Sequence, residues 1–300
     1  MDMYQNRFFA MGTRFYALLP DLEEGKAERL FYHLRGEVNR IEQKMSRFLP
    51  ESEVSRLNAA AAGETVEPDE ELFDLLQACR YIWEKTDGAF DLTCRPLMEY
   101  WKDKESEADE DFQQVKDRCG FQHLLLDPDQ RTAAFTRNGM EIDFGGLGKG
   151  YALEKIKEMI LNTEAKSAFI SFGESSVLAL GEHPAGGAWK IGMNNYLDPG
   201  KTLHEFRLCG GSVSTSSNFR VNDSGRLVNH RHIIDPHSGK PWENLSAVSV
   251  HAESPLLAEM LSTACLVSES EKIRSLKEAY PEVDIVRADY WTPEVVVTSY

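Results

Sequence analysis

The sequence has few basic residues for its length and no long apolar run. Its 300 residues include 33 Lys and Arg against 49 Asp and Glu, which gives a formal net charge of −16 at pH 7. Because Lys and Arg hold nucleic-acid phosphates, this balance argues against a nucleic-acid partner. No apolar segment reaches the length of a membrane span, so we expect no transmembrane segment.

Paired cysteine motifs and an export signal are also missing. The five cysteines are an odd number without a C-x-x-C pair, which predicts reduced, mostly buried thiols rather than a disulfide frame or a zinc site. Residues 1–7 show no charged region followed by an apolar stretch, and no lipobox cysteine. As the sequence stands we expect a cytoplasmic protein, or an exported one if a leader has been removed.

Periodicity predicts a mixture of amphipathic helices and short strands. At 42% hydrophobic residues, the chain can bury a sizeable core in one large domain or two small ones. Helical apolar spacing covers residues 29–48, 69–85, 150–161, 255–267 and 269–279. Short apolar runs predict strands at 122–126, 131–136, 140–144, 167–172, 176–180, 188–193, 203–208, 211–215, 230–234, 245–251, 283–287 and 294–298. We therefore expect an α+β fold of largely antiparallel sheets packed with helices, with residues 102–118 as an acidic surface segment.

A glycine-rich turn follows the predicted strand at 140–144. Residues 145–150 contain four glycines and Lys149, and a predicted helix comes directly after them. Bare backbone groups at a helix start, beside a positive charge, form a plausible phosphate site. The spacing matches neither the P-loop nor the G-x-G-x-x-G dinucleotide pattern. A structural turn whose glycines only supply positive φ remains the alternative.

Two further segments carry polar residues at informative spacing. His232 and Ile234 lie two apart on a predicted strand, which places them on one face before a turn at 236–239. Glu259 and Thr263 lie four apart on a predicted helix and therefore share a face. A carboxylate and a hydroxyl one turn apart suit a hard cation, although an ordinary solvated helix face explains the same spacing.

These segments belong to a longer series of motifs. The others are Met11-Gly12-Thr13, Met45-Ser46-Arg47-Phe48 with Ser52-Glu53 and Leu57-Asn58, and Gly88-Ala89-Phe90-Asp91 with Thr93, Pro96-Leu97 and Trp101. Together with 143–152, 232–241 and 259–263, and in this order, they resemble the motifs of the FAD:protein FMN transferases, also called the ApbE or thiamine-biosynthesis lipoprotein family. The resemblance covers nearly the whole chain. It implies one domain over residues 1–300, with the family's T-fold-related architecture and a flavin in a cleft.

The resemblance also implies a reaction and its residues. FMN would move from FAD, with magnesium and release of AMP, to a hydroxyl in the Thr/Ser target motif of an acceptor flavoprotein. The implied metal contacts are the Gly146 carbonyl and the side chains of Glu259 and Thr263, with Ser262 where some members have another carboxylate. The implied flavin and adenine contacts are Met11, Phe48, Ala89, Phe90, Asp91, Asp143, Lys149 and Ile234.

His232 is the implied base for the acceptor hydroxyl, because imidazole accepts a proton near neutral pH. The reaction rate is then expected to rise as the pH increases through the ordinary titration range of histidine. For His232 the alternative is a side chain that only stabilises the turn. For Phe48 and Phe90 the alternative is a plain core aromatic.

Three departures from the family pattern bear on activity. Glu259 stands where the family usually has Asp, residues 172–176 replace the usual Gly-Gly-Asp, and Ser217 stands where Gly is typical. None of them removes the metal carboxylate or His232. The sequence therefore also leaves open a magnesium-dependent FAD hydrolase that yields FMN and AMP, or a non-catalytic FAD-binding protein.

Overall fold

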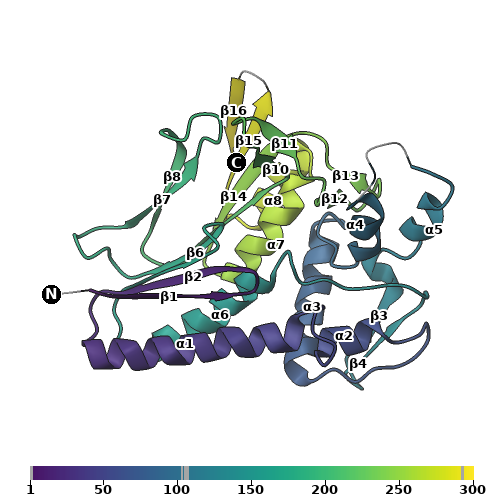
Figure 1. The fold of residues 1–300 in the computed structure, drawn as a ribbon, viewed down its shortest axis with the longest axis horizontal. Coiled ribbons are helices and arrows are strands. Elements are labelled where there is room, and N and C mark those ends of the chain that lie inside the picture. Colours follow the sequence, from purple (N-terminus) through teal and green to yellow (C-terminus); the bar gives the residue numbers. More distant parts are fainter. Residues whose placement is uncertain (1–2, 103, 105–107, 292–293) are drawn as a thin grey trace.

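The computed structural model describes residues 3–102, 104, 108–291 and 294–300. An eight-stranded sheet forms its centre in the order β1-β2-β5-β6-β9-β14-β15-β16, and every neighbouring pair is antiparallel (Figure 1). The strands are β1 (Tyr4–Ala10), β2 (Thr13–Leu19), β5 (Ala168–Phe172), β6 (Ser176–Leu180), β9 (Ser212–Ser217), β14 (Ser246–Ala252), β15 (Asp284–Trp291) and β16 (Glu294–Ser299). The predicted α+β class with antiparallel sheet is confirmed.

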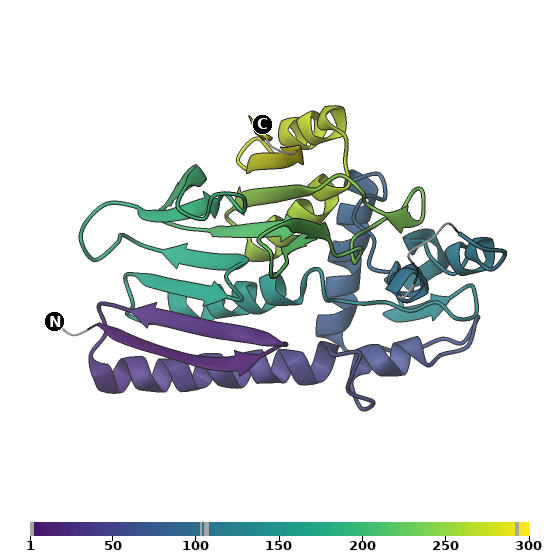
Figure 2. The same cartoon turned by 45° about the horizontal axis from the view of Figure 1, so that its top comes forward.

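Four helices cover one face of this sheet and a hairpin covers the other. The helices are α1 (Glu24–Met45), α6 (Gly148–Leu161), α7 (Pro255–Leu266) and α8 (Ser270–Ala279), and α1 lies along the β1–β2 hairpin (Figure 2). Alternation along β14 shows both faces, since Val248 packs with α7 and α8 whereas Ala247 packs on the opposite side. The covering hairpin is β7 (Trp189–Asn194) and β8 (Thr202–Leu208).

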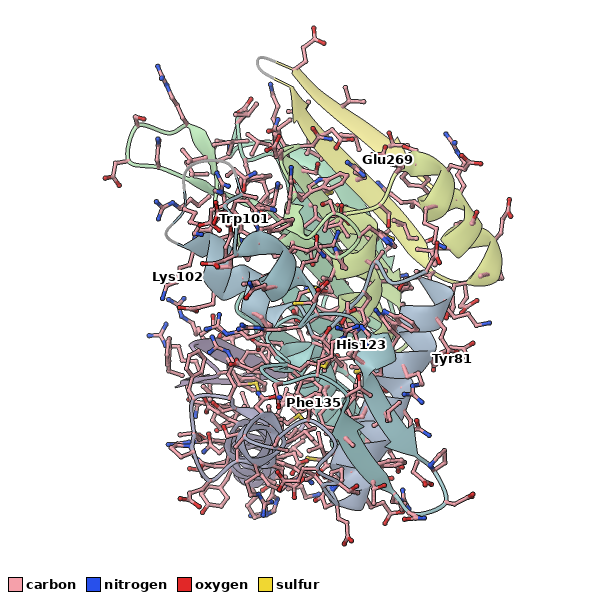
Figure 3. All side chains as sticks on the ribbon, turned by 90° about the vertical axis from the view of Figure 1, so that its right-hand side faces the viewer. Tyr81, Trp101, Lys102, His123, Phe135 and Glu269 are labelled. Carbon is pink, nitrogen blue, oxygen red and sulfur yellow. The ribbon has the colours of Figure 1, made fainter. Side chains whose placement is uncertain are left out.

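A smaller group of elements lies at one end of the sheet (Figures 1 and 3). It contains α2 (Glu53–Asn58), α3 (Glu70–Lys85), α4 (Arg95–Lys102), α5 (Phe112–Lys116), a 3₁₀ turn (Phe121–His123), and the hairpin of β3 (Leu124–Asp127) and β4 (Thr132–Phe135). One continuous apolar core joins Phe121 and Phe135 of this group to residues of α1 and α6. In the predicted acidic segment, Phe112 of α5 packs on buried Trp101. Residues 103 and 105–107 of that segment lie outside the described part of the chain.

The predicted strand at 140–144 is wrong, and the reason lies in its backbone hydrogen bonds. Ile142 donates its N–H to the side-chain oxygen of Asn58 at 2.8 Å and accepts from the Asn58 amide at 2.9 Å. Asp143 donates its N–H to the Leu92 carbonyl at 2.9 Å. These partners satisfy backbone hydrogen-bonding groups of Ile142 and Asp143 without a neighbouring strand. The side chains of Met140, Ile142 and Phe144 remain buried in the core.

Other boundaries also differ from the predictions. The strand expected at 230–234 is reduced to β12 (Ile234–Asp235), which pairs with β13 (Lys240–Pro241). The small hairpin of β10 (Phe219–Val221) and β11 (Leu227–Asn229) precedes it. The N-terminal β1–β2 hairpin was not predicted, and α1 ends at Met45 rather than at 48, which places Phe48 outside the helix.

Two predicted absences can be compared with the structure. Among the described residues, no helix is both long and apolar enough to cross a membrane. All five cysteines are free, and Cys79, Cys94 and Cys265 are buried.

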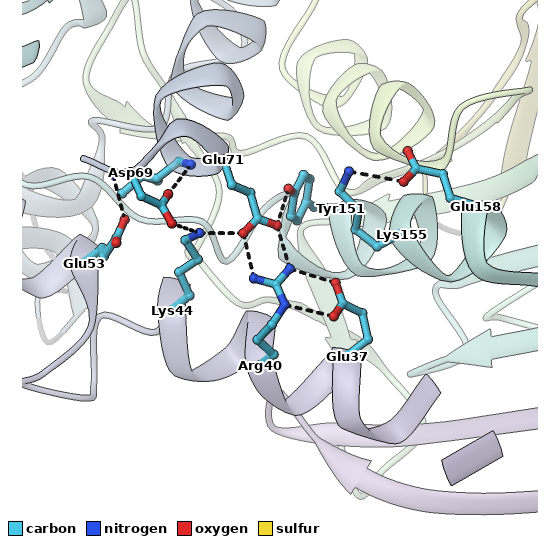
Figure 4. A network of polar contacts seen from close by, with 10 residues as sticks. Glu37, Arg40, Lys44, Glu53, Asp69, Glu71, Tyr151, Lys155 and Glu158 are labelled. Atoms are coloured by element: carbon cyan, nitrogen blue, oxygen red, sulfur yellow. Dashed lines mark hydrogen bonds and ion pairs between the residues drawn. The ribbon is translucent and has the colours of Figure 1, made fainter. Parts of the chain in front are cut away.

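A half-buried carboxylate, that of Glu71, joins α6 to α1 and α3 (Figure 4). Glu71 of α3 accepts two hydrogen bonds from Arg40 of α1, both at 2.7 Å, and one from Lys44 at 2.5 Å. Tyr151 of α6 donates its hydroxyl to the same carboxylate at 2.7 Å. The Arg40 hydrogen bonds hold the pKa of Glu71 well below its usual range, and burial together with Glu71 raises the pKa of Tyr151.

Glu71→Gln should lower the free energy of unfolding by about 1–3 kcal/mol at pH 7, because hydrogen bonds to a charged group are lost. The folded-state pKa of Glu71 lies below its unfolded value, so its stabilisation is full above that unfolded value, about 4.3, and is lost as the pH falls. Urea unfolding at pH 7 and pH 3 should therefore show the difference between wild type and variant narrowing in acid. Glu70→Gln, at an exposed ion pair with Arg131, is the control and should change stability by less than about 0.5 kcal/mol. A difference that stays constant with pH would contradict the role of the Glu71 charge.

Helices α6 and α7 approach closely at Gly150. A Cβ atom at this position would lie 2.7 Å from Oε2 of Glu259 and 2.7 Å from the Pro255 carbonyl oxygen. The second of these atoms belongs to the backbone and cannot move aside cheaply. Gly150 is therefore required by the contact between the helices.

Gly150→Ala should destabilise the protein by about 1–3 kcal/mol through overpacking. Gly148→Ala is the matched control, because a Cβ at Gly148 meets nothing within 4 Å. Since alanine favours the helix over glycine, this control should be neutral or stabilising by up to about 1 kcal/mol. Thermal unfolding of both variants tests the difference, and equal midpoints would contradict the close-contact explanation.

Candidate active site

Two adjoining cavities contain almost all of the residues predicted for the site. The Glu259 cavity, of about 460 Å³, is lined by Glu259 and Thr263 and by residues from 89–98, 143–149, 214–217 and 232–236. The Phe48 cavity, of about 410 Å³, is lined by residues from 11–13, 42–48, 143–149 and 173–175. The two cavities share four wall residues, Asp143, Gly145, Lys149 and Ser175.

The glycine-rich turn forms the boundary between the cavities. Its first residues are held by Asp143, whose Oδ1 accepts the Gly145 N–H at 2.8 Å. Although the structure describes all four glycines of 145–150, none of them has a positive φ, so the positive-φ explanation of this turn is wrong. At Gly150 the absent side chain instead permits the close approach of α7. A Cβ at Gly146 would lie 3.8 Å from Oγ1 of Thr263, which brings the turn against α7.

Glu259 is a buried carboxylate that is only half satisfied. Its helix begins with Ser254 as N-cap and Pro255 in the first turn, and Glu259 follows one turn later with 3% of its surface exposed. Oε1 accepts from Nζ of Lys149 at 2.5 Å, whereas Oε2 has no hydrogen-bond partner in the described chain. The ordinary solvated-face explanation of this residue is therefore wrong. A buried, unpartnered carboxylate oxygen is costly and indicates a site for a cation.

Thr263 and Gly146 lie on the same cavity wall as Glu259. The Thr263 hydroxyl donates to the Glu259 carbonyl at 3.1 Å, which leaves its oxygen lone pairs able to accept. The described residues contain no cluster of three or more His, Cys, Asp or Glu placed to hold a metal. One carboxylate, one hydroxyl and one carbonyl form a sparse set of oxygen donors, which suits magnesium because this ion keeps several waters and substrate oxygens.

Ser262 is the one predicted site residue that lines neither cavity. It is fully buried, and its hydroxyl forms hydrogen bonds with Ser216 at 2.8 Å and Ser214 at 3.2 Å and donates to the Glu259 carbonyl at 3.0 Å. These contacts tie α7 to β9. The geometry gives Ser262 a place in helix-to-sheet packing and does not support it as a ligand.

The Phe48 cavity contains an ion pair that sequence reasoning did not single out. Nε of Arg47 donates to Oδ2 of Asp143 at 2.8 Å, and its guanidinium lies 3.8 Å from the centroid of the Phe48 ring. Phe48 is 75% exposed, so the core-aromatic alternative is wrong for this residue. Met11 lies on the same wall and donates its N–H to Glu42 at 2.8 Å. Arg47 already stood in a recognised motif, and its charge beside Phe48 was the signal available in the sequence.

The 89–91 segment lines the Glu259 cavity and is held by hydrogen bonds to the Asp91 carboxylate. Oδ1 of Asp91 accepts from the Thr93 N–H at 2.8 Å and from the Thr93 hydroxyl at 2.6 Å, and Oδ2 accepts from the Phe121 N–H at 3.0 Å. Burial raises the pKa of Asp91. Its carboxylate is thus engaged by protein groups. Phe90 is buried, as its core-aromatic alternative requires, yet it also contributes to the cavity wall together with Ala89.

His232 and Ile234 lie together on the wall of the Glu259 cavity. Burial, with a smaller contribution from His230, lowers the pKa of His232 to about 4. The Nδ1 atoms of the two histidines are 3.0 Å apart, so this contact engages Nδ1 of His232 and leaves Nε2 available. His232 is therefore neutral near pH 7 and able to accept a proton.

The Glu259 cavity has one further wall that the sequence did not assign. It is lined by Ser214, Thr215, Ser216 and Ser217 of β9, and Arg95 and Met98 of α4 also line the cavity. The run of four hydroxyl residues was the available signal. Because side chains alternate along a strand, the hydroxyls of Ser214 and Ser216 contact Ser262 of α7. The Thr215 hydroxyl instead contacts Ser249 of the neighbouring strand β14.

Comparison with known proteins agrees with this arrangement. Residues 11–286 match the model of the ApbE family. The chain is 26% identical over 272 residues to an FAD:protein FMN transferase of Klebsiella pneumoniae, covering 87% of this chain and 83% of that protein. It is 28% identical over 255 residues to an FAD:protein FMN transferase of Treponema pallidum, covering 78% and 70% of the two chains.

Solved structures show the same fold. The ApbE protein of Thermotoga maritima superimposes with a TM-score of 0.85 at 26% identity, covering 98% of this chain and 96% of that one. The flavinyl transferase ApbE of Pseudomonas stutzeri also gives 0.85, at 24% identity, covering 99% and 94%. With the family model matched over most of its length, this chain belongs to the ApbE family.

Proposed function

We propose that this protein is an FAD:protein FMN transferase that moves FMN from FAD to a Thr or Ser hydroxyl of an acceptor protein, with magnesium, and releases AMP. One observation carries the proposal: the buried carboxylate of Glu259 has an oxygen without a partner among the residues that the structure describes, and it lies beside Thr263 and the Gly146 turn. The activity for which the relatives are named, FAD:protein FMN transfer, supports the flavin and the protein acceptor.

The residues present fit a magnesium ion. Glu259, the hydroxyl of Thr263 and the carbonyl of Gly146 would hold it, since all three line one cavity. When bound, the ion would neutralise the diphosphate of FAD and stabilise charge on the phosphoryl oxygens. In a chain with a net charge of −16, such a cation also offsets the repulsion of an anionic substrate.

The chain's own residues divide the remaining work. Lys149 and the start of α6 provide positive charge at the boundary between the two cavities, where a diphosphate can span them. Nε2 of His232 takes the proton of the acceptor hydroxyl as its oxygen bonds to the FMN-side phosphorus. The bond from that phosphorus to the bridging oxygen breaks, and AMP leaves with that oxygen.

Incubation with FAD, magnesium and a peptide that carries a Thr or Ser target tests the function. The peptide should gain the mass of an FMN group, and AMP should appear in equal amount. Glu259→Gln should lower this transfer by roughly 100-fold or more, because metal stabilisation of the transition state is worth several kcal/mol. Glu253→Gln, at an exposed carboxylate that pairs with Lys157, is the control and should transfer normally.

Two outcomes would contradict the transferase. FMN and AMP formed at the same rate without any acceptor would identify an FAD hydrolase. FAD that stays intact with magnesium and acceptor present would identify a flavin-binding protein.

His232→Asn should keep the affinity for FAD and lower turnover by roughly 10²–10⁴-fold, the usual worth of a general base. The pKa of His232 near 4 changes the expected pH profile. Only the neutral imidazole accepts a proton, so the contribution of His232 should be constant from pH 8 to about pH 5 and fall below about pH 4, not near the ordinary value of about 6.5. Transfer rates between pH 4 and 8 test this point.

His237→Asn, at an exposed histidine of the following turn, is the matched control and should retain the wild-type rate. Normal turnover of His232→Asn would remove His232 from the mechanism. Weaker FAD binding with an unchanged pH profile would reduce it to a residue that stabilises the turn.

A further inference from the structure

Lys149 and Glu259 form an ion pair at the centre of the proposed metal site. Nζ of Lys149 lies 2.5 Å from Oε1 of Glu259, and the two side chains are 23% and 3% exposed. Lys149 belongs to the first turn of α6, whereas Glu259 lies on α7. The carboxylate assigned to a metal is thus already partly neutralised by a residue that the proposed reaction needs elsewhere.

The exposures show which partner of the pair can move. Glu259 is enclosed by α7 and by Gly150 of α6, where no space is left even for a Cβ. Lys149 is more exposed, lines both cavities, and carries its charge on a flexible four-carbon stem. A buried carboxylate without a cation costs several kcal/mol, so Lys149 remains on it until another cation replaces it.

We propose that Lys149 is an exchangeable counter-ion, which neutralises Glu259 in the free protein and moves to the FAD diphosphate when a divalent cation binds to Glu259. The inference rests on the proposed function and adds a coupling to it. Binding of the cation to Glu259 releases the Lys149 ammonium, which can then bind the diphosphate. Binding of the diphosphate to Lys149 in turn leaves the Glu259 carboxylate open to the cation. Coupling between two ligands is reciprocal, so magnesium and FAD should raise each other's affinity by the same factor.

The ion pair also lowers the affinity for magnesium alone. The cation must displace Lys149 from Oε1 before it can use the whole carboxylate. Removal of the lysine charge should therefore strengthen binding of magnesium to the flavin-free protein, although it weakens binding of FAD.

Calorimetric titration of the flavin-free protein with magnesium tests the exchange. Lys149→Gln should bind magnesium about tenfold more tightly than the wild type, since the attraction between two charges at this distance, with the carboxylate only 3% exposed, exceeds the 1.4 kcal/mol of that factor. Arg95→Gln is the matched control, because Arg95 lines the same cavity but pairs with Glu99. Its effect should stay below about threefold, as expected for a partly screened charge at a distance.

Repetition of the titration with FAD present tests the coupling. FAD should tighten magnesium binding in the wild type, and most of this gain should be absent in Lys149→Gln. Lys149→Arg keeps the charge, so it preserves the fold even if the neutral variant does not. Its guanidinium can hold both oxygens of Glu259, and it should bind magnesium more weakly than the wild type.

The outcomes separate this inference from the proposed function. Equal magnesium affinity in wild type, Lys149→Gln and Lys149→Arg, together with loss of binding in Glu259→Gln, would overturn the exchange and leave the metal site intact. Unchanged magnesium binding in Glu259→Gln would overturn the metal site itself. An effect of Arg95→Gln as large as that of Lys149→Gln would reduce the role of Lys149 to general repulsion, and so would overturn the exchange.

Discussion

Neutralisation of one buried charge, the carboxylate of Glu259, is the constraint on which the site depends. This group lies where α6 meets α7, with 3% of the residue's surface exposed. The neighbours of this carboxylate meet its needs. Lys149 provides positive charge and Gly150 provides space. Thr263 and Gly146 add oxygen donors beside it. An isolated ion in this position would destabilise the fold, so the fold and the site have the same electrostatic requirement.

The position of α6 connects that requirement to the rest of the molecule. Gly150 fixes how closely α6 approaches α7, and the next residue, Tyr151, is hydrogen-bonded to Glu71 of α3. Glu71 in turn is held by Arg40 and Lys44 of α1. The first turn of α6, which carries Lys149 and follows the glycine turn, is therefore placed from two sides. Contacts on both sides hold this charged part of the site in a fixed position where solvent and substrate enter.

Sequence reasoning succeeded where the signal was local and failed where it was tertiary. Helical spacing placed Glu259 and Thr263 on one face, and the structure puts both on one cavity wall. The alternation of apolar residues at 140–144 predicted a strand. The sequence pattern does not reveal that Asn58, 84 positions away, supplies hydrogen bonds in place of a neighbouring strand. The pair of Lys149 with Glu259 depends on the contact between α6 and α7, and spacing cannot show that contact. The lowered pKa of His232 arises mainly from burial, which likewise becomes visible only in the fold.

Glu259, at a position where the family resemblance implies Asp, has Gly150 as its close structural neighbour. A glutamate places its carboxylate one methylene further from the helix axis, and the structure uses that reach to set Oε2 against Gly150 and Oε1 against Lys149. Any residue with a Cβ at position 150 would collide with this longer side chain. That Cβ would also lie 2.7 Å from the Pro255 carbonyl oxygen and 2.8 Å from the Cβ of Glu259, so the helix contact itself requires glycine at 150, and the longer side chain at 259 fits beside it. The site thus keeps a carboxylate on the cavity wall, at the cost of a close approach that only glycine permits.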